Sequence, residues 1–246
     1  MASNLSRRGF LSGTATVAAL GAGEALVAAE ARAEQGSQQR SVKILGICCS
    51  PRQGKTTAAA MGVCLEAAKA IDPRIEVELI ELAGLKIPGE VAAGVPLAAG
   101  ERDDFPSLLP KLSDPAVAGI ILGTPVYFGN MTSLCKALLE RFMVFHKDKQ
   151  LANKIAGVLA VGGARNGGLE LTIRSVQVAL MSQQMIVVGD APPTSHWGGT
   201  VWGGSPAVNA GAAPDITRDE EGMATVRNLG RHVAEMALRL TPLESR

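Results

Sequence analysis

The chain has 246 residues, with 24 lysines and arginines against 23 aspartates and glutamates. Once residues 1–33 are set aside for the reasons given below, 21 basic and 21 acidic residues remain, so the rest of the chain has no formal net charge. This balance argues against a nucleic-acid partner and against attraction to an acidic membrane surface.

The first 33 residues have the features of a signal peptide for twin-arginine export, in the right order. The pair Arg7-Arg8 precedes a weakly apolar run over 14–27, and residues 31–33 read Ala-Arg-Ala, which is typical of a cleavage site. The run is short and Glu24 interrupts it, so we expect no stable membrane insertion of the mature chain. An ordinary secretory signal and a disordered arm are the alternatives.

This interpretation sets the expected boundaries and location. We expect a leader over 1–33, a linker over 34–41 and one domain over 42–246, which is long enough for a substantial core. The leader predicts a periplasmic or otherwise exported protein. Because the twin-arginine route carries proteins that fold before they cross the membrane, it also raises the expectation of a tightly bound cofactor.

From residue 41 onward, strand patterns and helix patterns alternate. Apolar or alternating runs predict strands at 42–48, 75–82, 119–123, 154–161 and 185–188. Helical periodicity predicts helices at 57–71, 107–112, 132–142, 169–183 and 219–240, and loops are expected at 83–106 and 189–214. Five apolar strands joined by helices predict a parallel sheet covered on both faces, with ligands bound beyond the carboxyl ends of its strands.

The loop after the first strand suits a phosphate. Its residues are Ser50, Arg52, Gln53, Gly54, Lys55, Thr56 and Thr57. The following helix begins with unpaired N–H groups that carry partial positive charge, the hydroxyls add donors, and Gly54 allows close approach. A helix cap made by Ser or Thr without any ligand is the alternative. A P-loop is disfavoured, because Cys49 stands where that motif requires glycine.

The loops after the third and fourth strands suit a planar ring. The first of them contains Pro125, Val126, Tyr127, Phe128, Gly129 and Asn130, and the second contains Gly163, Arg165, Asn166, Gly167 and Gly168. Backbone amides can form hydrogen bonds to the polar edge of a ring while the aromatic side chains pack beside it. Arg165 would place a positive charge near the ring and stabilise its reduced, anionic form. The alternatives are aromatic side chains folded into the core and a flexible glycine-rich connection.

Taken together, three segments resemble the NAD(P)H-dependent FMN reductase group of flavodoxin-like proteins, over about Val42 to Gly189. They are Ser50-Pro51-Arg52, Pro125-Val126-Tyr127-Phe128-Gly129 and the glycine-rich segment from Gly162 to Gly168. The iron–sulfur flavoprotein type is the branch most similar to this chain, and the tryptophan-repressor-binding-protein-type quinone reductases are cousins. The resemblance implies an α/β, flavodoxin-like, doubly wound five-stranded parallel sheet in the order 2-1-3-4-5.

The same resemblance implies an FMN site and a homo-oligomer, either a dimer or a tetramer. The phosphate would lie at the first loop and the ring between the other two. Two departures stand out. Lys55-Thr56-Thr57 replaces the Gly-Asn-Thr often found in the family, and residues 82–105 contain no cysteine. An iron–sulfur cluster is therefore not expected there. No metal site is expected elsewhere, and we interpret the four cysteines as small buried hydrophobic residues.

By resemblance, the chain is an FMN-dependent oxidoreductase that transfers electrons from NAD(P)H to a quinone, a flavin or a similar small acceptor. No side chain stands out as an acid or base, although His196, in a loop with both tryptophans, is a candidate proton donor to a bound quinone. That loop either covers the flavin, lines a dimer contact or packs against the rest of the domain without a role in binding. The alternative functions are an FMN electron carrier that serves protein partners without NAD(P)H, and a binding module that has lost its flavin.

Overall fold

The computed structural model describes residues 41–204 and 213–241. The predicted leader over 1–33 lies outside these residues, as does all but the last residue of the predicted linker over 34–41. Within the described ranges, no helix is both long enough and apolar enough to cross a membrane.

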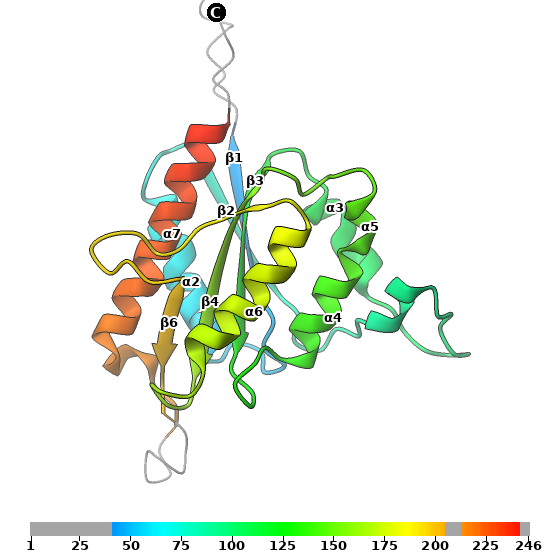
Figure 1. Cartoon of the computed structure of the whole chain (residues 1–246), viewed down its shortest axis with the longest axis horizontal. Helices are drawn as coiled ribbons and strands as arrows, with labels where there is room; N and C mark the ends of the chain where they lie inside the picture. The colour runs from blue at the N-terminus through cyan, green and yellow to red at the C-terminus, as the bar shows by residue number, and fades with distance from the viewer. Residues whose placement is uncertain (1–40, 205–212, 242–246) are drawn as a thin grey trace, which may run out of the picture. The chain divides into compact units, whose positions relative to one another are not determined.

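A parallel sheet forms the centre of the domain (Figure 1). Its strands are β1 (Val42–Cys48), β2 (Ile75–Glu81), β3 (Val117–Pro125), β4 (Ile155–Gly162), β5 (Ile186–Val187) and β6 (Gly199–Trp202). The order β2-β1-β3-β4-β5 confirms the predicted order. Every residue of β4 is buried, as expected for a central strand of a sheet covered on both faces.

The edge beyond β4 differs from the prediction. The short β5 pairs only with Ile155 and Ala156, and β6 pairs with Leu159–Gly162 further along the same strand. The prediction of a continuous loop over 189–214 is therefore wrong for Gly199–Trp202. Within β6 the Val201 side chain is buried and the Thr200 N–H donates to the Thr225 hydroxyl, 2.8 Å away. Tertiary contacts thus form a strand that is too short to recognise among glycines.

Helices cover both faces of the sheet (Figure 1). Their bounds are α2 (Thr56–Lys69), α3 (Leu109–Leu112), α4 (Ser133–Arg141), α5 (Met143–His146), α6 (Leu169–Ser182) and α7 (Glu220–Leu240). Single 3₁₀ turns occur at η1 (Gly89–Ala93), η2 (Phe105–Leu108) and η3 (Ile216–Arg218). Helices α2 and α7 pack on one face of the sheet, and α4 and α6 on the other.

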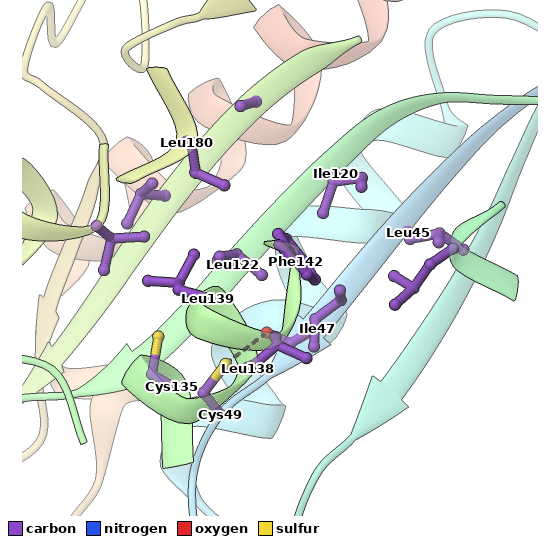
Figure 2. Packing of buried hydrophobic residues seen from close by; sticks show 14 of the residues in the cluster. Leu45, Ile47, Cys49, Ile120, Leu122, Cys135, Leu138, Leu139, Phe142 and Leu180 are labelled. Carbon is purple, nitrogen blue, oxygen red and sulfur yellow. Dashed lines mark hydrogen bonds between the residues drawn. The ribbon is translucent and has the colours of Figure 1, made fainter. Parts of the chain in front are cut away.

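Alternate strand residues enter two separate hydrophobic clusters. Leu45 and Leu122 point towards α4 and α6, in the cluster that Figure 2 shows, whereas Ile44 and Ile121 join the cluster beneath α2 and α7. This alternation follows from the two-residue period of a strand. It leaves the carboxyl ends of the strands as the edge from which polar loops emerge.

The long connection over 83–106 is anchored by a buried arginine of α4. The Arg141 guanidinium lies 2.9 Å from an Asp103 carboxylate oxygen, donates to the Pro88 carbonyl and stacks 4.5 Å from the centre of the Phe105 ring. Arg141 is only 5% exposed. The segment contains the η1 turn and the start of η2 and otherwise has the irregular structure that was predicted.

The four cysteines are buried free thiols, which confirms the prediction of burial. Burial raises the pKa of Cys48 to about 11 and that of Cys64 to about 12. The Cys135 thiol, together with burial, raises the pKa of Cys49 well above its ordinary value. These three thiols are protonated at neutral pH and pack as small hydrophobic groups. In the described part of the chain, no group of cysteine, histidine and acidic side chains is suited to hold a metal ion.

Candidate functional site

The three predicted loops leave the same edge of the sheet. They follow β1, β3 and β4, which are neighbours in parallel register. The Cys49 N–H donates to the Gly123 carbonyl over 2.7 Å, and the Thr132 hydroxyl donates to the Cys49 carbonyl over 2.8 Å. The Val126 N–H donates to the Val161 carbonyl over 2.9 Å. The fold therefore brings the loops together where α/β sheets bind ligands.

The first loop presents an uncapped helix terminus. Helix α2 has Lys55 as its N-cap without a side-chain hydrogen bond, and its first turn contains no acidic residue. The first-turn N–H groups are therefore available to an anion. The alternative of a Ser or Thr cap does not describe this helix, because the Ser50 hydroxyl instead accepts from the Arg52 N–H within the preceding turn.

A buried hydroxyl at the start of α2 supports the same interpretation. Thr57 is 1% exposed, and its Oγ1 has no hydrogen-bond partner among the described residues, as is also the case for Thr172 Oγ1 and Trp202 Nε1. A buried hydroxyl without a partner costs free energy, so such a group calls for a ligand or another explanation. Together with the exposed side chains of Arg52, Gln53 and Lys55, these groups fit a phosphate.

One residue at this loop was missed by sequence reasoning. Glu81 ends β2, and its Oε2 accepts a 2.8 Å hydrogen bond from the N–H of Gly54, where φ is +61°. The sequence signal that could have identified it is an acidic residue at the end of the strand that pairs with β1. Its contact with the loop depends on the pairing of Cys48 with Glu81 across the two strands.

The second loop is a tight turn that presents two aromatic side chains outside the core. Tyr127 and Asn130 exchange backbone hydrogen bonds of 2.9 and 3.1 Å, with Phe128 and Gly129 at positive φ. Tyr127 is exposed and Phe128 fully so. The alternative that these aromatic side chains fold into the core is therefore wrong. A left-handed backbone at Phe128 costs about 1 kcal/mol and favours a functional reason for the turn.

The third loop lies directly against the second. Gly168 has φ of +93° and is the N-cap of α6. A Cβ atom added there would lie 2.9 Å from the Cα of Gly129. Exposed backbone at Gly163 and Gly167 lies along the same loop, beside Asn166. The two loops thus have backbone close to backbone.

Arg165 points to the start of α7. Its guanidinium lies 3.1 Å from Asp219 Oδ1 and 2.9 Å from Glu221 Oε2, and 5.8 Å from the centre of the Trp202 ring. The buried Asp219 also caps α7 and accepts from the Trp202 N–H over 3.0 Å. The charge of Arg165 is therefore paired with carboxylates, and its role here is to tie the third loop to the start of α7.

His196 is oriented by a buried carboxylate. Its Nδ1 lies 3.4 Å from Oδ2 of Asp190. The same Oδ2 accepts a hydrogen bond from the Thr194 hydroxyl, and Oδ1 accepts one from the His196 backbone N–H. A groove of about 580 Å³ extends from Asn166 of the third loop to this imidazole. A carboxylate on one ring nitrogen sets the tautomer and leaves the other nitrogen for proton transfer.

Comparison with known proteins gives a consistent result. Residues 42–198 match the sequence profile of the family described as NADPH-dependent FMN reductase. The chain is 38% identical over 200 residues to an iron-sulfur flavoprotein of Methanocaldococcus jannaschii, covering 79% of this chain and 97% of that protein. It is 31% identical over 163 residues to an NAD(P)H dehydrogenase (quinone) of Paracoccus denitrificans, covering 63% and 78%.

A solved structure shares the architecture. The flavodoxin, WrbA-like protein from Agrobacterium tumefaciens matches with a TM-score of 0.53 at 13% identity, over 81% of this chain and 98% of that one. This likeness confirms the predicted flavodoxin-like fold, and at this level of identity it supports the fold alone.

Proposed function

Because the chain belongs to the NADPH-dependent FMN reductase family and is an oxidoreductase, we propose that its three strand-end loops bind FMN and that it transfers electrons from NAD(P)H to a quinone, a flavin or a similar small acceptor. The observation that carries the proposal is the convergence of these loops on adjacent strands, within the matched residues. Bound FMN would supply the hydride and electron transfer itself.

The first loop would hold the phosphate. The unpaired N–H groups at the start of α2 and the Thr57 hydroxyl would donate hydrogen bonds to the phosphate. The side chains of Arg52 and Lys55 would add positive charge. The Ser50 hydroxyl holds the turn by bonding to the backbone of Arg52. The chain thus supplies both the charge and the fixed backbone that recognition of a phosphate requires.

The second and third loops would hold the ring. Tyr127 and Phe128 offer apolar surface that excludes water, and the exposed backbone at Gly163 offers hydrogen bonds to polar ring edges. His196 is the candidate to hold a proton for an acceptor in the adjoining groove, with Asp190 orienting its ring. These residues act by binding, orienting and protonating.

The test begins with the absorbance spectrum of the full chain purified under native conditions. We expect a yellow protein that binds added FMN, and bleaching of its visible band by NADH or NADPH without oxygen, followed by return of colour on adding a quinone. A colourless protein that does not take up FMN would contradict the proposal. Bound FMN that neither nicotinamide reduces would favour the electron carrier.

We also propose that residues 1–33 direct twin-arginine export of the folded protein. The order of the arginine pair, apolar run and cleavage site supports this, and the family match begins only at residue 42. We expect R7K combined with R8K to leave the protein in the cytoplasm, measured by immunoblotting of cell fractions. The control is R32K, which makes the same change near the cleavage site and is expected to leave export intact. Equal export of all three proteins would contradict the proposal.

We further propose a homo-oligomer that uses the outer face of α6. Leu171, Val178 and Met181 lie on one stripe of this helix and are each more than half exposed. Exposed apolar residues in such a group are typical of contacts between subunits. Light scattering of the purified chain is expected to give the mass of a dimer or tetramer, and a monomeric mass would contradict this.

A further inference from the structure

The carboxylate of Glu81 occupies part of the first loop. Its Oε2 accepts the 2.8 Å hydrogen bond from the Gly54 N–H, and Gly54 lies two residues before the first residue of α2. Parallel pairing of β1 with β2 places Glu81 opposite Cys48, and the loop starts two residues later at Ser50. The sheet thus places Glu81 beside this loop, because β2 ends next to the strand from which the loop leaves.

The loop is otherwise positively charged. Neither Arg52 nor Lys55 forms an ion pair within residues 41–204 and 213–241, and the first turn of α2 contains no acidic side chain. The start of the helix adds partial positive charge. Glu81 is therefore the anion that contacts this loop, and it bonds to the kind of backbone donor that a phosphate uses.

Resting on the function proposed above, we propose that Glu81 is a specificity-determining residue that competes with the flavin phosphate for the first loop. A carboxylate and a phosphate are both acceptors and both negative, so they cannot share the Gly54 N–H and they repel each other at short range. The phosphate must either displace the Glu81 side chain or bind beside it. In both cases Glu81 weakens the binding of a flavin that carries a phosphate and leaves a flavin without one unaffected.

The experiment compares wild type, Glu81→Gln and Glu76→Gln as full-length chains by equilibrium dialysis against FMN and against riboflavin. Glutamine removes the charge and keeps an oxygen that accepts from the Gly54 N–H. Glu76 is exposed near the opposite end of β2, so its variant reproduces the change in net charge away from the loop. We expect E81Q to bind FMN about tenfold more tightly, which corresponds to 1.4 kcal/mol, with riboflavin unchanged. E76Q is expected to match wild type for both flavins.

The outcomes separate this inference from the function on which it rests. Equal affinity of the three proteins for FMN, or weaker binding by E81Q, would overturn the competition and leave the FMN site intact. Tighter binding of riboflavin to the same extent as FMN would also overturn it, because the effect would then not depend on the phosphate. Failure of all three proteins to bind FMN would contradict the proposed function and this inference with it.

Discussion

Alanine at Gly168 is expected to weaken FMN binding by about 10- to 100-fold, the effect of about 1.4–2.8 kcal/mol of steric strain placed in the site. The added Cβ would lie 2.9 Å from the Gly129 Cα, so the backbones of the second and third loops would have to separate. A φ of +93° adds a conformational cost for any residue with a Cβ atom. FMN titration followed by flavin fluorescence measures the loss.

Gly84→Ala is the matched control for this prediction. Gly84 has a φ of +82°, and a Cβ atom there would meet no atom within 4 Å. The substitution therefore carries a similar backbone cost of about 1 kcal/mol without the contact between loops. We expect its FMN affinity to match wild type. If G168A also bound FMN with wild-type affinity, the ring would not depend on the close approach of these two loops.

The sheet and its covering helices could be predicted because their signals are local. Each central strand is a run of apolar residues, and each long helix has its apolar residues at helical spacing. Boundaries were less accurate. Strand β3 extends over Val117–Pro125 beyond the predicted 119–123, because Val117 is buried and Thr124 and Pro125 still pair with β4. The four residues of β6, with glycines around them, are too few to show the alternation of apolar and polar residues that identifies a strand.

The candidate site was predictable only in part, for a related reason. The glycines and hydroxyl residues after each strand are visible in the sequence. The carboxylates that contact these loops come from distant parts of the sequence. Gly54 and Glu81 are 27 residues apart, and Arg165 and Asp219 are 54 apart. The direction in which Arg165 points depends on where α7 begins, which no local pattern reveals. Contacts between residues this far apart in the sequence depend on the topology of the fold.

A second glycine substitution is expected to affect stability most. Helix propensity alone predicts that Gly230→Ala, inside α7, would stabilise the chain by about 1 kcal/mol. We expect instead a loss of about 3 kcal/mol in the free energy of unfolding. The added Cβ would overlap the Cys64 carbonyl oxygen and lie 2.9 Å from its carbon, in the helix α2. A carbonyl inside a helix cannot move unless the helix moves.

Gly62→Ala makes the same chemical change in α2 with the opposite expected sign. A Cβ atom at Gly62 would meet no atom within 4 Å, so helix propensity determines the effect of the substitution. We expect the free energy of unfolding to rise by about 0.5–1 kcal/mol. Urea unfolding followed by circular dichroism measures both changes. Equal stability of G230A and wild type would contradict the close packing of α2 on α7.

The packing of these two helices also links stability to the site. Helix α2 begins at the first loop, and α7 begins directly after its N-cap Asp219, which holds Arg165 of the third loop. If alanine at Gly230 separates the helices, the first and third loops move relative to each other. FMN binding by G230A should therefore weaken even where the variant is still folded, whereas G62A should bind as wild type does. Normal FMN affinity in a destabilised but folded G230A would show that the site tolerates such a shift.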